Sequence, residues 1–208
     1  MKKKFYYAST EGRLGMSREA LSTHWTHAIP VYRNAPHVWN VGGRDNVAAF
    51  LLDTGEGLIL IDTGLCPETF YLVIDRIWRA GFDPKDIRKI FLTHWHGDHS
   101  CCVRFLTEMT GAEVWLSRED EAEHQKHADD DFPMRVTPYT VTNLYDDSTP
   151  IHMGRFTIRT RLCPGHTVGA TSFFFEDTDV KTGKTYKVAL HGGLGVGQMS
   201  KEGVVKAG

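Results

Sequence analysis

The sequence contains no apolar run long enough to cross a membrane and no strong excess of charge of either sign. Its apolar stretches stay well short of the roughly 18 residues that a membrane-spanning helix needs. The 24 basic residues nearly balance the 26 acidic ones, and no long basic run provides an electrostatic footprint for nucleic acid. These absences argue against membrane and nucleic-acid partners and favour a small-molecule substrate or a peptide.

Cysteine is also scarce, with four residues in the chain. They are too few and too irregularly spaced to form a disulfide framework. The basic start "MKKK" is followed by polar residues and glycine instead of the apolar segment of an export signal. We therefore expect a reducing, cytoplasmic setting.

The length of 208 residues, 41% of them hydrophobic, is that of an ordinary globular domain. We expect one domain over residues 1–208, with an N-terminal extension over 1–35 and a core over 36–208. Two apolar strands, at about 47–53 and 57–62, are joined by the turn "TGEG".

The middle of the chain alternates between helical and strand patterns. A helix is expected in "PETFYLVIDRIWRAG", with Phe70, Ile74, Ile77 and Trp78 on its apolar face. Buried strand "IRKIFLTH", a helix ending at Gly111 and strand "AEVWLS" follow. The next helix, in "SREDEAEHQKH", is charged, and we expect Ser117 to cap it and Glu119 and Asp120 to interact with its positive N-terminal dipole. Its pattern predicts a solvated face that includes His124 and His127. From residue 139 onward the pieces are β-like, so the fold class is α/β, with helices on the outer faces of sheets.

The stretch "FLTHWHGDHSCC" places three histidines and one aspartate within six positions directly after an apolar strand. His94 and His96 are two residues apart, so in an extended segment both imidazoles point to the same side and reach one metal ion. Asp98 and His99 are offset from this pair and turn toward a neighbouring position. The residue mix suits zinc and predicts a metal site.

The motif "THWHGDH" resembles the H-x-H-x-D-H signature of the metallo-β-lactamase superfamily of hydrolases. The upstream "LILIDTG" and the downstream "CPGHTVGATSFFF" resemble two further segments of that family, in the same order. The resemblance extends from about residue 40 to about residue 195. It implies a four-layered αββα sandwich with two zinc ions side by side in the complete protein.

The resemblance also assigns ligands. One zinc ion would be held by His94, His96 and His166, and the second would use Asp98 and His99. Asp62 lies where the family keeps an aspartate that supports a ligand from behind. By sequence alone, Asp62 is equally well explained as a turn-forming residue before a Thr-Gly pair.

Two departures from the family pattern concern the second zinc ion. Many members have a bridging aspartate where this chain has Gly192 and Gly193, which resembles the metallo-β-lactamase subclass without a bridging carboxylate. The last histidine of that subclass also has no counterpart. We expect either that the sequence is truncated at its C-terminal end, with the ligand beyond Gly208, or that His191 supplies it.

The chemistry implied by the resemblance is hydrolysis. A zinc-bound hydroxide would attack an ester, lactone, thioester or lactam carbonyl, and the carboxylate of Asp98 would orient the nucleophile and transfer a proton. The alternative is a non-hydrolytic or iron-containing redox member with an incomplete second metal site. The sequence does not choose the substrate, because one metal site serves many reactions in this superfamily.

Overall fold

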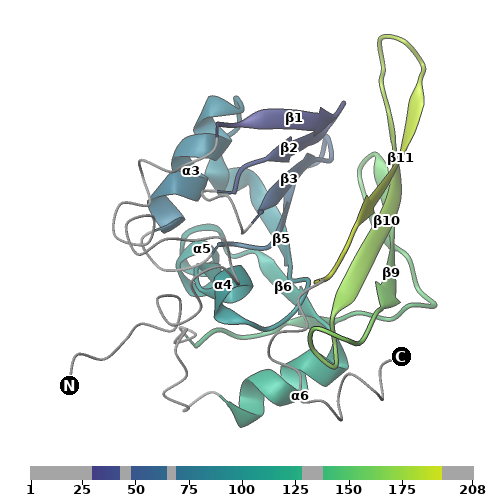
Figure 1. Ribbon diagram of the computed structural model, residues 1–208. Coiled ribbons are helices and arrows are strands. Elements are labelled where there is room, and N and C mark those ends of the chain that lie inside the picture. The colour runs from purple at the N-terminus through teal and green to yellow at the C-terminus, as the bar shows by residue number, and fades with distance from the viewer. Residues whose placement is uncertain (1–29, 43–47, 65–68, 128–137, 194–208) are drawn as a thin grey trace, which may run out of the picture.

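Two β-sheets pack face to face in the computed structural model, which describes residues 30–42, 48–64, 69–127 and 138–193 (Figure 1). The first sheet has seven strands in sequence order: β1 (Tyr32–Ala35), β2 (Val38–Asn40), β3 (Phe50–Asp53), β4 (Leu58–Ile61), β5 (Ile87–Phe91), β6 (Glu113–Leu116) and β7 (Asn143–Leu144). The second is antiparallel, in the order β11 (Thr185–Leu190), β10 (Thr171–Thr178), β9 (Phe156–Leu162) and β8 (Ile151–Met153).

The first sheet changes from antiparallel to parallel at β4. Strands β3 and β4 form a hairpin whose turn uses positive φ at Gly55 and Gly57, a conformation that glycine adopts without strain. From β4 onward the strands are parallel, so each connection crosses over the sheet. These crossovers contain the helices α3 (Thr69–Arg79), α4 (Gly97–Ser100), α5 (Val103–Thr110) and α6 (Arg118–Lys126), with a short 3-10 helix at Pro84–Asp86.

Alternation along the strands separates two apolar cores. In β4, Leu58 and Leu60 face the helix side of the sheet, whereas Ile59 and Ile61 face the second sheet. The helix-side core includes Val73 and Leu106, with other buried residues from α3 and α5. The core between the sheets contains stacked rings from both layers, because Phe91 lies 5.7 Å from Phe173. Helices, first sheet and second sheet are therefore three consecutive layers.

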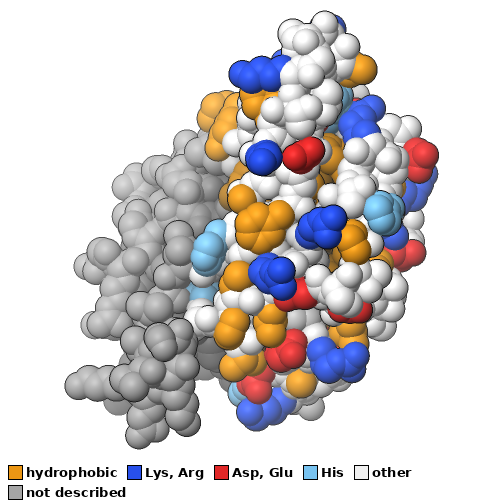
Figure 2. Space-filling view, turned by 90° about the vertical axis from the view of Figure 1, so that its right-hand side faces the viewer, with side chains coloured by type: hydrophobic (Ala, Val, Ile, Leu, Met, Phe, Trp, Pro, Cys, Tyr) orange, Lys and Arg blue, Asp and Glu red, His pale blue; other side chains and the backbone are white. Residues whose placement is uncertain are grey.

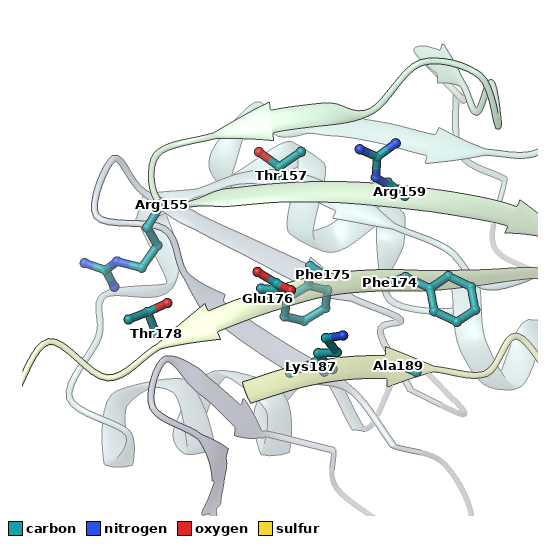
Figure 3. Close-up of a pocket in the computed structure, with 10 residues that line it drawn as sticks. Arg155, Thr157, Arg159, Phe174, Phe175, Glu176, Thr178, Lys187 and Ala189 are labelled. Carbon is teal, nitrogen blue, oxygen red and sulfur yellow. The ribbon is translucent and has the colours of Figure 1, made fainter. Parts of the chain in front are cut away.

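Among the described residues, no helix covers the outer face of the second sheet (Figures 1 and 2). Figure 2 shows basic and hydrophobic side chains scattered over this face. A hollow of about 660 Å³ lies there, and the side chains around it include Arg159, Phe174, Glu176 and Lys187 (Figure 3). Three of the four expected layers are thus present in the described part of the chain. No described helix is long and apolar enough to cross a membrane.

Most of the predicted elements are confirmed. The β3–β4 hairpin forms, α5 ends at Gly111 in the left-handed conformation, and the side chain of Ser117 caps α6. Two burial predictions are wrong. Trp78 is 61% exposed, because α3 buries Val73 and Ile77 and turns Trp78 outward.

His124 is not on a solvated face. It is 4% exposed and stacks on Tyr139 at 4.1 Å, because this side of α6 packs against the rest of the domain. Short strands β1, β2 and β8 were not predicted. Most of the expected extension over 1–35 lies outside the described residues.

Candidate metal centre

The site lies at the carboxyl ends of the parallel strands, where loops from neighbouring strands converge. Asp62 directly follows β4, and His94 follows β5 after two residues. The chain then enters α4, which begins at Gly97 and carries Asp98 and His99. His166 comes from the other sheet, in the loop between β9 and β10. The topology therefore brings residues from both sheets to one place.

Three imidazoles meet there. His94, His96 and His166 have potential ligand atoms that all lie within 4.8 Å of one another. The closest approach is 3.1 Å, between Nδ1 of His96 and Nε2 of His166. His94 is fully buried, and the three ring centroids form a nearly equilateral triangle, with 4.9 Å between His94 and His96, 4.6 Å between His94 and His166 and 4.8 Å between His96 and His166. Three converging imidazoles can hold one ion.

A second group shares His94 and adds Asp98 and His99, again with ligand atoms within 4.8 Å of one another. Two buried polar atoms in this group, Nε2 of His94 and Oδ1 of Asp98, have no hydrogen-bond partner among the described residues. Buried polar atoms are nearly always paired, so unpaired ones call for an explanation such as a bound ion. Imidazole and carboxylate donors fit zinc, and the residues present fit the predicted metal centre.

Asp62 is a buried anchor behind this group. Its carboxylate accepts hydrogen bonds from the backbone N–H of Thr93 at 2.8 Å, from the Thr93 hydroxyl at 2.8 Å, and from Nδ1 of His99 at 2.7 Å. The contact at Nδ1 leaves Nε2 of His99 for another partner. Asp62 therefore contacts one of the potential ligands directly, and its role as the support of a metal ligand stays a prediction.

Burial and neighbouring charges set different protonation tendencies in the metal-free cluster. Burial lowers the pKa of His94 well below its usual range, and it lowers the pKa of His96 to about 4. Burial would also lower the pKa of His99, but the charges of Asp62 and Asp98 outweigh it and raise that pKa to about 9. At neutral pH, His94 and His96 are therefore neutral and ready to bind metal, whereas His99 carries a proton.

His191 does not join either group of potential ligands in the described part of the chain. It is exposed, and its Nδ1 accepts a hydrogen bond from the N–H of Gly193 at 2.9 Å. Gly193 itself lies against the ring of His166, where an added Cβ would come within 2.9 Å of Cδ2. The glycine found in place of a bridging aspartate thus lets the backbone approach the histidine ring.

The role of one residue of this region was not predicted from the sequence. Asp120 was assigned only a favourable interaction with the dipole of α6, yet it is fully buried and contacts both loops that carry histidines. Its position three residues after the capping Ser117 was the only local signal, and such acidic residues are usually solvated. The hollow on the second sheet is a separate feature, because none of its lining residues belongs to the histidine cluster (Figure 3).

The comparisons with known proteins agree with this geometry. The family model described as the metallo-beta-lactamase superfamily matches residues 42–180, which is more than half of the chain. BJP-1, a subclass B3 metallo-beta-lactamase of Bradyrhizobium japonicum, matches with a TM-score of 0.80 at 23% identity. The match covers 90% of this chain and 73% of that one, and at this identity it shows a shared fold.

Two further structures are more similar in sequence. The metallo-beta-lactamase GOB-18 from Elizabethkingia meningoseptica is 29% identical, with a TM-score of 0.73 over 84% of this chain and 63% of that one. An enzyme described as the first B3 metallo-beta-lactamase with an active-site glutamic acid is 27% identical, with a TM-score of 0.75 over 95% and 79% of the two chains.

Proposed function

Because the chain belongs to the metallo-beta-lactamase superfamily and its histidine cluster fits a metal-dependent hydrolase of that family, we propose that it is a zinc hydrolase acting on a strained or activated carbonyl. A β-lactam is the first substrate class to test, since the structures at 27% and 29% identity are described as metallo-beta-lactamases. Lactones, thioesters and other esters are the other candidates, because they present the same electrophilic carbon to a nucleophile.

The observation that carries the proposal is the convergence of two donor groups on the shared His94. We assign His94, His96 and His166 to a first zinc ion, and Asp98 with His99 to a second. Zinc, when bound, lowers the pKa of a water ligand toward 7 and polarises a carbonyl oxygen. Such a site needs no dedicated side-chain base to generate the nucleophile at neutral pH.

The chain's own residues supply position and proton transfer. Oδ1 of Asp98 is buried and has no described partner, so it is available to accept a hydrogen bond from the attacking water and to pass that proton to the leaving atom. Asp62 holds His99 through Nδ1, which fixes the orientation of that ring. The neutral state of His94 and His96 leaves their lone pairs free at pH 7.

The test begins with metal content and then measures turnover. The purified 208-residue chain, loaded with zinc, is assayed against a chromogenic β-lactam, a lactone, a thioester and an aryl ester. We expect hydrolysis of at least one substrate, loss of activity with a chelator and recovery with zinc. A chain that binds zinc but turns over none of the four would contradict the proposal. Iron in the purified protein without hydrolysis would favour the redox alternative.

A pair of matched variants assigns the role of Asp98. Asp98→Asn is expected to lower kcat by about 10²–10⁴-fold at saturating zinc, the range for loss of general acid–base catalysis. Asp75→Asn is the control, because Asp75 lies on the exposed side of α3 and pairs with Arg79 four residues along the helix. It should retain wild-type kcat. Full activity in Asp98→Asn would remove that residue from the mechanism.

A further inference from the structure

The two loops that carry the three converging histidines are joined through one carboxylate. Asp120 is the third residue of α6 and is fully buried. Its Oδ2 accepts a hydrogen bond from the backbone N–H of Trp95 at 3.0 Å, and Trp95 lies between His94 and His96. Asp120 therefore holds the loop of the H-x-H pair by a hydrogen bond to the backbone of its central residue.

The same carboxylate holds the loop of His166. Oδ2 of Asp120 also accepts from the hydroxyl of Thr167 at 2.8 Å, and its Oδ1 accepts from the N–H of Gly169 at 2.7 Å. Thr167 directly follows His166. One side chain thus contacts the residues next to all three histidines, although the two loops are 70 residues apart in the chain.

A second observation shows that this close docking depends on the absence of a side chain at Gly169. A Cβ there would lie 2.1 Å from the Ser117 hydroxyl and 2.6 Å from Oδ1 of Asp120. Glycine lets the loop of His166 lie directly on the start of α6. The loop and the helix are built to meet at this carboxylate.

The burial of Asp120 is not compensated by a described basic side chain, because its partners are two backbone N–H groups and one hydroxyl. Moving a carboxylate out of water costs free energy, and stability alone is often served equally well by an apolar residue. Stability alone therefore does not explain why a carboxylate occupies this position. Its hydrogen bonds to both histidine loops give it a separate role.

We propose that Asp120 is a positioning residue of the metal centre, whose carboxylate holds the H-x-H loop and the His166 loop in the register at which their three imidazoles meet. It belongs to neither group of potential ligands, so it acts through the histidines. The inference rests on the proposed assignment of these histidines to zinc.

The experiment measures zinc affinity by competition with a chromophoric chelator, together with the visible spectrum of the cobalt-substituted chain and the thermal midpoint of the metal-free chain. Asp120→Asn puts an amide NH₂ against one of the donors, and Thr167→Val removes one hydrogen bond at nearly constant volume. Both are expected to weaken zinc binding by about 10–100-fold, as for other groups that orient ligands. Both should also alter the cobalt spectrum. Thr167→Ser keeps the hydroxyl and should restore wild-type binding.

Asp177→Asn is the matched control. Asp177 is also a buried aspartate, but it accepts hydrogen bonds from the backbone and from the ring of His37. It lies six residues along β10 from Thr171, which corresponds to about 20 Å of strand. Its substitution should lower the thermal midpoint of the metal-free chain and leave zinc affinity unchanged.

The outcomes separate the inference from the proposed function. Zinc binding as tight as wild type in Asp120→Asn and Thr167→Val would overturn the inference alone. An equal loss of affinity in Asp177→Asn would also overturn it, by showing a general effect of destabilisation. If Asp120→Asn does not fold, Thr167→Val and Thr167→Ser decide. Tight zinc binding without hydrolysis would refute the proposed activity and leave the inference intact, whereas a wild-type chain that binds no zinc would refute both.

Discussion

Replacing Asp62 by asparagine should release the proton of His99 in the metal-free chain. Asp62 adopts a positive φ of 59°, a conformation that asparagine tolerates as well as aspartate does, so the backbone need not change. The substitution removes the negative charge 2.7 Å from Nδ1 of His99. It leaves burial, which lowers the pKa of His99, opposed only by the charge of Asp98.

The size of the effect follows from the raised pKa of His99. A fall from about 9 to the ordinary value of about 6.5 is worth at most about 3.5 kcal/mol, at about 1.4 kcal/mol for each pH unit. Because the folded-state pKa is raised, this contribution is fully present below pH 6.5 and is lost as pH rises through 9. For a chain of this size, it corresponds to at most roughly 7–14 °C in thermal midpoint.

Histidine ring protons followed by NMR during a pH titration of the metal-free chain give the pKa directly. We expect one histidine to titrate near pH 9 in the wild type and at least about 2 pH units lower in Asp62→Asn. The thermal midpoint of the wild type should fall between pH 6.5 and 9, and that of the variant should lack this step. A histidine still titrating near pH 9 in Asp62→Asn would refute the role assigned to this carboxylate.

Further tests use the glycine contacts and the pH dependence of the cluster. Gly169→Ala should destabilise the fold by at least about 1–3 kcal/mol because its Cβ collides with Ser117 and Asp120, whereas Gly165→Ala in the same loop meets nothing within 4 Å and should be neutral in chemical denaturation. The metal-free chain should lose stability as pH falls from about 6.5 toward 4. The pKa of His96 is lowered in the folded state, so the unfolded state binds more protons over this range. A thermal midpoint that stays constant between pH 6.5 and 4 would contradict this prediction. Zinc binding near pH 7.5 should release about one proton from His99. Calorimetry in buffers of different ionisation enthalpy measures this release. If no proton is released, His99 is already neutral before zinc binds.

Local patterns predicted the elements that local chemistry controls. The hairpin of β3 and β4 depends on a glycine-containing turn, the end of α5 on Gly111 and the start of α6 on Ser117. Burial was harder to predict, because it depends on what packs against each face. Trp78 fits an apolar helical stripe but points outward, and His124 lies in a charged segment but is buried against Tyr139.

The residues of the candidate site also differ in whether local sequence patterns predict them. His94, His96, Asp98 and His99 lie within six residues, so their spacing alone brought them into one prediction. His166 was assigned through the family resemblance, since a lone histidine after Pro-Gly carries little information by itself. The structure then brings it within 3.1 Å of His96.

The sequence by itself determined that the chain is an α/β protein with a closely spaced group of potential metal ligands, because strand alternation, capping residues and ligand spacing are local properties. Only the tertiary structure decided which distant groups complete the site. Asp62 meets His99 and Asp120 meets Trp95 and Thr167 across the sheet ends, and these contacts depend on the packing of two sheets and α6. Hydrogen bonds between residues far apart in the chain produce no spacing pattern in the sequence, so local patterns cannot predict them.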